Sequence, residues 1–194
     1  DLVRSRGLGD VYKRQMSDKA TMKADYLKAL EAWNNRVDEG FAAGKPVRAE
    51  VSLDDKAWGK LNFPGMVDQQ GLGDFDGLIW LRRTVDIPAS WTGKKVQLVL
   101  GAIDDNDITY WNGREVGRTD GYSVQRNYTV PGKLVKAGPL TLAIRVTDTG
   151  GGCGMPDELY LRSDNGEQIS LAGEWKYQIA VSYTHLRAHE TVLD

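Results

Sequence analysis

Apolar and polar residues alternate along most of the chain after residue 46, in short runs that end at glycine, proline or aspartate. A period of two places every second side chain on one face of a strand, so these runs predict β-strands. The clearest run is Leu140–Val146, and Lys95–Leu100 repeats the pattern with Val96, Leu98 and Leu100 on one face. The expected strands are 78–87, 95–100, 108–111, 114–116, 124–130, 140–146, 158–162, 168–171 and 175–179. Short strands at regular spacing predict a mostly β fold, an antiparallel β-sandwich or jelly roll.

Residues 20–43 follow a different spacing, with apolar side chains three or four positions apart. The stripe consists of Tyr26, Leu27, Leu30, Trp33, Val37 and Phe41. This period predicts one amphipathic α-helix that precedes the sandwich, and Gly44 and Pro46 are the expected end of the helix.

One hairpin is indicated directly by Asn112-Gly113, which separates two of the expected strands. A type I′ turn needs positive φ at both central residues, and this dipeptide supplies it at the lowest cost.

The two ends of the chain have related coding sequences. With suitable codons, the complementary strand of the DNA encoding residues 5–15 reads as residues 181–190. Residues 5–15 and 181–190 resemble a sequencing-adaptor DNA translated into protein. We therefore expect residues 1–15 and 181–194 to be artefactual flanks, residues 16–45 to be a helical segment and residues 46–180 to be the sandwich domain.

Charge and composition exclude several classes of function for residues 16–180. Removing the flanks takes five of the 25 basic and four of the 27 acidic residues, which leaves 20 and 23 and a net charge of −3. This balance argues against a nucleic acid or an anionic membrane as partner. The single cysteine, Cys153, allows no disulfide within the chain.

Residues 16–180 lack the groups that common hydrolytic and metal centres need. Both histidines, His185 and His189, lie in the expected flank. Without them a Ser-His-Asp triad or a Cys-His dyad has no base, and zinc has neither histidine nor a cysteine pair. The glycine-rich stretch at 150–154 lacks the Lys-Ser/Thr of a phosphate-binding loop, so a flexible loop between strands is the expected reading. We expect no cofactor, no metal and no catalytic residue in this part of the chain.

Asp104, Asp105 and Asp107 form an acidic cluster just before the hairpin, which ends at Asn112. Clustered oxygen ligands suit calcium, although the spacing differs from the EF-hand loop. The alternative is that these short polar side chains, with Asn112, hydrogen-bond the backbone of tight turns, and we favour this structural role.

Four further side chains are candidates for carbohydrate binding. Trp111, next to the turn, and Trp58, in a glycine-containing loop, are expected to be exposed and able to stack on a sugar, whereas Trp80 and Trp175 are expected in the core. Arg126 and Tyr122 complete the set. Arg126 could grip a carboxylate bidentately or pair with a nearby aspartate and hold the hairpin.

Several motifs in order carry a resemblance to a known family. They are D-G-x-x-W at 76–80, L-x-L-G-x-I-D-D-x-D at 98–107, W-N-G-x-x-V-G at 111–117, and L-x-G-x-W-x-Y at 171–177. With the intervening R-x-Y strand and the D-x-G-G-G-x-G loop at 148–154, the region 75–179 resembles the galactose-binding-like β-sandwich inserted in bacterial sialate O-acetylesterases. The N-G-x-x-V-G hairpin alone also resembles the jelly rolls of family 2 glycoside hydrolases.

The resemblance implies a secreted or periplasmic parent enzyme that removes O-acetyl groups from sialic acid, with an O-acetylated sialoglycan as substrate. It further implies a split SGNH-type α/β catalytic domain, whose serine lies before this segment and whose histidine lies after it. The missing catalytic domain would be the partner of the sandwich. The alternative is a galactose-binding-like, sugar-binding domain of a family 2 glycoside hydrolase, and a third hypothesis is a sandwich that only buttresses a catalytic domain.

Overall fold

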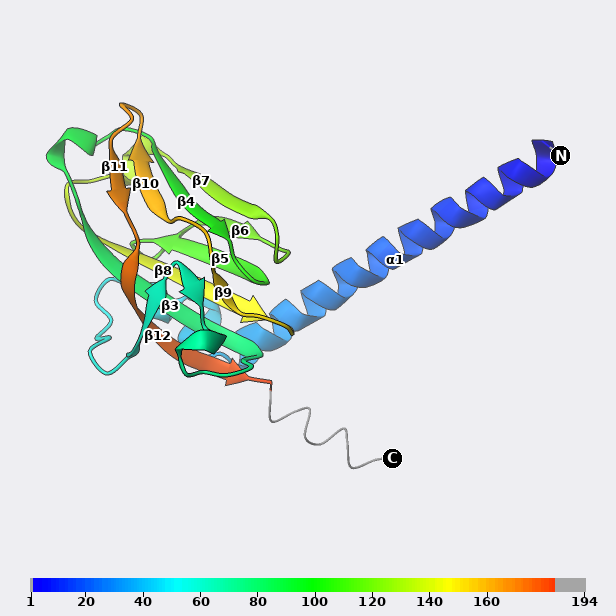
Figure 1. Ribbon diagram of the computed structural model, residues 1–194, viewed down its shortest axis with the longest axis horizontal. Coiled ribbons are helices and arrows are strands. Elements are labelled where there is room, and N and C mark those ends of the chain that lie inside the picture. The colour runs from blue at the N-terminus through cyan, green and yellow to red at the C-terminus, as the bar shows by residue number, and fades with distance from the viewer. Residues whose placement is uncertain (1, 184–194) are drawn as a thin grey trace. The chain divides into compact units, whose positions relative to one another are not determined.

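The computed structural model describes residues 2–183, and for residues 2–17, 42 and 43 it describes the backbone alone. The chain divides into two units at the boundary between Val37 and Asp38. The first is a single helix, α1 (Leu2–Val37), of 36 residues (Figure 1). No helix in the described range is long and apolar enough to cross a membrane. His185 and His189 lie outside the described residues.

Helix α1 ends six residues earlier than the spacing predicts, at Val37, and a short 3₁₀ helix, η1 (Glu39–Gly44), takes its place. The carbonyl of Asp38 accepts a hydrogen bond from the Phe41 N–H at 2.9 Å, and the Asp38 carboxylate accepts one from the Gly40 N–H at 2.8 Å. An aspartate that binds the backbone two residues ahead competes with helix continuation. The helical stripe is therefore interrupted before Phe41.

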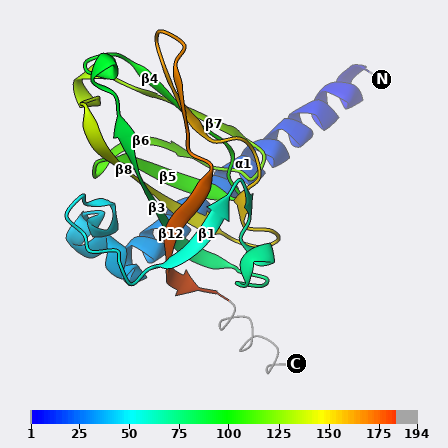
Figure 2. The same ribbon diagram turned by 60° about the vertical axis from the view of Figure 1, so that its left-hand side comes forward.

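The second unit is an antiparallel β-sandwich, as predicted. A six-stranded sheet has the order β1-β12-β3-β8-β5-β6, a four-stranded sheet has the order β11-β10-β4-β7, and β2 pairs with β9 (Figure 2). The strands are β1 (Gly59–Phe63), β2 (Gly65–Met66), β3 (Gly77–Ile87), β4 (Val96–Ala102), β5 (Asn106–Trp111), β6 (Arg114–Thr119), β7 (Gln125–Val130), β8 (Gly138–Asp148), β9 (Gly154–Met155), β10 (Tyr160–Ser163), β11 (Gln168–Ser170) and β12 (Gly173–Ser182). Short 3₁₀ helices are η2 (Val47–Ala49), η3 (Asp68–Gln70), η4 (Ala89–Trp91) and η5 (Gly132–Leu134).

The main core lies between the two larger sheets. Val96, Leu98 and Leu100 of β4 are all 0% exposed, and the alternate apolar residues of β8 are equally buried. Trp175 is also 0% exposed, and its Nε1 donates to the carbonyl of Leu171 at 2.8 Å. The alternation in the sequence thus predicted the inward face of these strands correctly.

Strand β3 is buried on both faces at its start. Ile79 and Leu81 belong to the core between the sheets, whereas Leu78 and Trp80 belong to a second cluster on the opposite face of the six-stranded sheet. This explains why the sequence L-I-W-L is continuously apolar, since a strand covered on both sides needs no polar face.

The segment Asp38–Trp58, which we call the covering segment, packs on that outer face. The buried carboxylate of Asp38 accepts hydrogen bonds from Trp80 Nε1 and Arg145 Nε, both at 2.9 Å, and from Arg48 Nη1 at 3.0 Å. Arg82 binds the carbonyl of Arg48 and the carboxylate of Asp55. Charged side chains thereby join the covering segment to the central strands β3 and β8.

Candidate functional site

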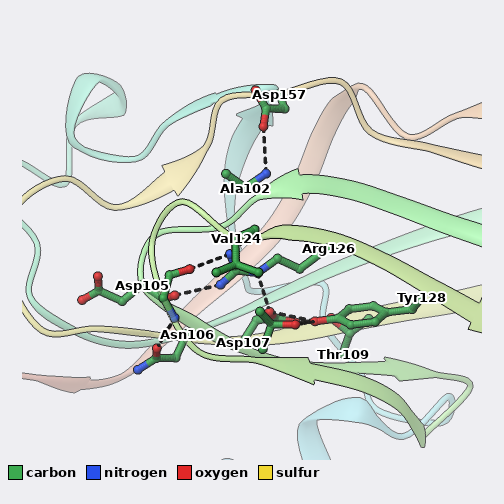
Figure 3. Close-up of polar contacts among 11 residues, drawn as sticks. Ala102, Asp105, Asn106, Asp107, Thr109, Val124, Arg126, Tyr128 and Asp157 are labelled. Atoms are coloured by element: carbon green, nitrogen blue, oxygen red, sulfur yellow. Dashed lines mark hydrogen bonds and ion pairs between the residues drawn. The ribbon is translucent and has the colours of Figure 1, made fainter. Parts of the chain in front are cut away.

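Two residues of the acidic cluster, Asp105 and Asp107, contact Arg126 beside the β6–β7 loop (Figure 3). Even-numbered residues of β7 point into the sandwich, and odd-numbered residues of β5 point toward them from the other sheet. Arg126 and Asp107 meet between the sheets at 2.8 Å, and both side chains are 0% exposed. The pair is thus a polar link across an otherwise apolar interior.

The hydrogen bonds of this pair are directed at the protein itself. Arg126 donates Nε to Asp107, Nη2 to the carbonyl of Asp105 at 2.7 Å, and Nη1 to the carbonyls of Gly121 and Val124. The Asp107 carboxylate also accepts from Thr109 Oγ1 at 2.7 Å and Tyr128 Oη at 2.9 Å. Of the two roles expected for Arg126, the structure therefore shows the pairing with an aspartate.

Burial dominates the electrostatics of this polar link. It raises the pKa of Asp107, although the hydrogen bonds from Arg126, Thr109 and Tyr128 act in the opposite direction. Burial and the Asp107 charge also raise the pKa of Tyr128. An ion pair removed from water costs desolvation energy that only complete hydrogen bonding offsets, and here both partners have several bonds.

Asp105 of the acidic cluster and the adjacent Asn106 bind backbone groups at turns. The Asp105 carboxylate accepts from Thr149 N at 2.9 Å and Thr149 Oγ1 at 2.6 Å, and Asn106 Oδ1 accepts from Gly121 N at 2.9 Å. Within the range that the structure describes, no group of three or more histidine, cysteine or acidic side chains could hold a metal ion. The hydrogen bonds of Asp105 and Asp107 fit the structural role expected for these side chains.

Two aspartates near this end have raised pKa values. Burial, together with a hydrogen bond and the charge of Asp105, raises the pKa of Asp104 to about 6. Burial and the charges of Asp105, Asp104 and Asp76 raise the pKa of Asp148 to about 7, although the Gly150 N–H lowers it. Asp148 is 0% exposed, and its Oδ2 has no hydrogen-bond partner among the described residues.

These carboxyl groups do not have the arrangement of a glycosidase centre. Retaining glycosidases place two carboxyl groups about 5–5.5 Å apart around the substrate, and inverting enzymes place them farther apart. Asp104 and Asp105 instead share a side-chain hydrogen bond, and Asp148 is inaccessible to a substrate. The raised pKa values of Asp104 and Asp148 reflect burial first and the charges of neighbouring acidic side chains second.

Asn112 occupies the first central position of the predicted turn. Its φ is 47° and that of Gly113 is 79°, as a type I′ hairpin requires. Asn112 Oδ1 also accepts a hydrogen bond from the Thr141 N–H at 2.8 Å, which ties the hairpin to β8.

The expected exposure of Trp111 is wrong. Trp111 is 2% exposed, and its Nε1 donates to the carbonyl of Leu134 at 3.0 Å. It stands on the inward face of β5 with Asp107 and Thr109, so the turn beside it does not bring it to the surface. Trp58 is half-buried on the outer face of the six-stranded sheet, where the Arg82 guanidinium lies 5.7 Å from its ring. Only Tyr122 of the four candidates, 66% exposed on the β6–β7 loop, presents its ring freely.

The structure does not gather the four carbohydrate candidates into one site. Arg126 and Trp111 lie inside the sandwich, Trp58 lies on an outer face and Tyr122 lies on a loop. A hollow lined by Pro64, Glu158, Tyr160 and Gln168, which the sequence reasoning missed, offers more free polar groups. In the sequence, the hollow is indicated only by Tyr160, which alternates with Leu159 and Leu161 in an expected strand and therefore points outward.

No protein-family model matches the chain, and no curated protein matches it. Several solved structures are similar to the chain. A β-glucuronidase from an uncultured Clostridium species shares 14% identity, with a TM-score of 0.50 over 74% of this chain and 36% of its own. A β-glycosidase from Bacteroides vulgatus shares 22% identity, with a TM-score of 0.51 over 66% of this chain and 19% of its own. A β-glucuronidase from Bacteroides uniformis shares 16% identity, with a TM-score of 0.50 over 70% of this chain and 26% of its own.

These similarities define the fold as an antiparallel, galactose-binding-like β-sandwich of the kind that glycoside hydrolases contain. The chain spans between 19% and 36% of the length of these three enzymes.

The predicted sialate O-acetylesterase parent is wrong, because the structural neighbours are glycosidases. The physical reason lies in what the resembling motifs do. Asp107 of the D-D-x-D motif binds Arg126, and Asn112-Gly113 forms the hairpin turn. Such residues build the sandwich and carry no chemistry of an attached catalytic domain, so they report the fold and not the reaction.

Proposed function

We propose that residues 46–180 form a non-catalytic accessory domain of a family 2 glycoside hydrolase. The observation that carries the proposal is the fold similarity to the β-glycosidase of Bacteroides vulgatus and to β-glucuronidases. The partner of the sandwich would be the catalytic domain of the same enzyme, and the substrate class would be a β-linked glycan.

The internal geometry supports a non-catalytic role for this part of the enzyme. The buried ion pair Arg126–Asp107 is saturated by internal hydrogen bonds. The side chains of Asp104 and Asp105 form a hydrogen bond with each other. Neither set leaves an acid and a base facing a common substrate position, which hydrolysis of a glycosidic bond requires.

Two roles are open to such an accessory domain, namely sugar binding and support of the catalytic domain. Tyr122 and Val124, 66% and 46% exposed, lie on the β6–β7 loop, and Arg126 holds the carbonyls of Gly121 and Val124. A fixed loop with exposed apolar side chains suits either role. Export of the enzyme to the periplasm or the outside of the cell stays a prediction.

The test compares this chain with the product of the complete gene. We expect the complete gene to encode a TIM barrel with paired glutamates and its product to hydrolyse p-nitrophenyl β-glycosides. We expect the 194-residue chain to leave both p-nitrophenyl β-glucuronide and p-nitrophenyl acetate at the background rate. A complete product without glycosidase activity, or robust turnover by the chain alone, would contradict the proposal.

A further inference from the structure

A hollow of about 460 Å³ opens beside the edge of the four-stranded sheet. Strand β11 forms this edge, since it pairs only with β10 in that sheet (Figure 1). The residues that line the hollow include Pro64, Glu158, Tyr160, Gln168, Ser170 and Ala172. Its volume falls in the range of small-molecule sites, roughly 300–1,000 Å³.

The polar groups around the hollow are not used by the fold. Glu158, Tyr160 and Gln168 form no side-chain hydrogen bond or ion pair with any residue between 2 and 183. Their sequence neighbours behave differently. Asp157 accepts from Ala102 N at 2.8 Å, and Glu167 accepts from Trp91 Nε1 at 2.6 Å. Asp157 and Glu167 thus form the hydrogen bonds that hold these segments. The carboxylate of Glu158, the phenol of Tyr160 and the amide of Gln168 remain available to a ligand.

The backbone that carries these groups is held firmly. Leu159, Leu161 and Leu171 are at most 2% exposed in the main core, and Leu171 N donates to the carbonyl of Leu159 at 2.8 Å. Tyr160 lies directly opposite Ser170 in the antiparallel register. A site whose walls are fixed before binding loses little conformational entropy when a ligand arrives.

The lining chemistry suits a neutral pyranose ring. The carboxylate of Glu158 can accept hydrogen bonds from vicinal hydroxyl groups, and the Gln168 amide can both donate and accept. The tyrosine ring and the face of Pro64 offer apolar surface to the C–H face of a sugar. The lining contains the acidic side chain of Glu158 and no basic one, which disfavours the carboxylate of a uronic acid, and the exposed Arg162, opposite Gln168 on β10, lies outside the lining.

We propose that this hollow, which we call the Tyr160 groove, is a binding subsite for a neutral pyranoside. The proposal deepens the proposed function and rests on it for the choice of a sugar over other small polar ligands. It assigns to the accessory domain a sugar contact that involves none of the side chains singled out in the sequence.

The experiment titrates the 194-residue chain with three probes and follows binding by ligand-observed and protein-observed NMR. The probes are methyl β-D-glucopyranoside, methyl β-D-galactopyranoside and sodium methyl β-D-glucuronide. We expect saturable binding of at least one neutral probe and at least about tenfold weaker binding of the glucuronide. Absence of saturable binding to both neutral probes, or equal affinity for the glucuronide, would overturn the proposal.

Substitutions of the lining residues test whether the sugar binds in the Tyr160 groove. Glu158→Gln and Gln168→Ala each should weaken binding about tenfold, because a hydrogen bond to a charged or buried partner contributes on that order. Matched controls are Glu50→Gln, an exposed glutamate that lines a different hollow beside the hairpin, and Tyr26→Phe, an exposed tyrosine of α1 that is compared with Tyr160→Phe in the groove. The controls should leave affinity unchanged, and circular dichroism should show that all variants fold. Weakening by Glu50→Gln or Tyr26→Phe, with Glu158→Gln neutral, would place the sugar elsewhere and refute the groove.

Failure of the groove and failure of the proposed function give different experimental outcomes. If no neutral probe binds but the complete gene encodes an active β-glycosidase, the groove is refuted and the accessory domain stands. If a neutral sugar binds but the complete gene encodes no glycosidase, the groove stands and the parent assignment fails.

Discussion

At the scale of single residues, polar side chains in the interior distinguish this sandwich from a purely apolar one. Arg126 and Asp107 are fully buried, and each has several hydrogen-bond partners from different strands and loops. Breaking a buried pair leaves an uncompensated charge and is far more costly than the pair is stabilising.

Replacement of Arg126 by methionine should therefore destabilise the chain strongly. We expect Arg126→Met to lower the free energy of unfolding by about 3–5 kcal/mol, because the Asp107 charge and three backbone carbonyls lose their donor. Urea unfolding followed by tryptophan fluorescence measures the change. The matched control is Arg118→Met, whose arginine pairs with Glu115 on the surface and is worth at most about 1 kcal/mol. Equal effects of the two variants would contradict a structural role for the buried pair.

Asp148 should make stability depend on pH between about 4 and 7. Its folded-state pKa is raised to about 7 by burial and by the charges of Asp105, Asp104 and Asp76. The folded state therefore holds a proton that the unfolded state releases near pH 4, so this contribution is complete below that pH and is lost as pH rises through 7.

The variant Asp148→Asn removes this titration and should flatten the pH profile. We expect it to gain at least about 1 kcal/mol of stability relative to the original chain when pH is raised from 5 to 8, since one pKa unit corresponds to about 1.4 kcal/mol. Thermal or urea unfolding at several pH values provides the measurement. The control Asp86→Asn, at an exposed position of β3, should leave the pH dependence unchanged. An unaltered profile in Asp148→Asn would show that this carboxyl group is not the titrating one.

At the scale of elements, the covering segment explains why the six-stranded sheet is apolar on both faces. Ala49 of η2 joins Leu78, Trp80, Tyr110 and Ala143 in the outer cluster, and the Trp80 and Tyr110 rings stack with their centroids 5.7 Å apart. The segment itself has little regular structure, so its position depends on the contacts of Asp38 with Arg48, Arg145 and Trp80.

Substitution of Asp38 should release the covering segment. We expect Asp38→Asn to cost about 3–5 kcal/mol, because Arg48 and Arg145 lose their shared buried carboxylate. Limited trypsin digestion should cleave much faster after Arg48, which is buried in the original chain. The control Asp54→Asn, with an exposed carboxylate in the same segment, should keep the original cleavage rate. Equal protection of Arg48 in Asp38→Asn would show that apolar packing alone holds the segment.

At the scale of the whole molecule, the sandwich is a scaffold whose polar interior is internally satisfied. The similarity to glycosidase structures identifies the fold, and the motifs that suggested an esterase proved to be parts of that fold. The Tyr160 groove, proposed as a sugar subsite, lies on β10 and β11, and its polar groups Glu158, Tyr160 and Gln168 lie outside these motifs.

The amino-acid sequence alone determined the properties that depend on neighbours along the chain. Alternation located the strands β4 and β8 and their inward faces, and Asn112-Gly113 fixed the hairpin, because strand pleat and turn dihedrals are local. It missed β1, β2 and β9, which are short, with two or fewer buried apolar residues in each. So few alternating positions give no reliable period.

Only the tertiary structure decided which polar residues are structural and which are free. Arg126 and Asp107 are 19 positions apart, Asp38 and Arg145 are 107 apart, and no periodicity relates such partners. Trp111 stands beside a turn yet lies in the core, whereas Glu158 and Gln168 look ordinary in sequence yet face one hollow. Burial and pairing depend on how the two sheets and the covering segment pack, and that packing joins residues that are distant along the chain.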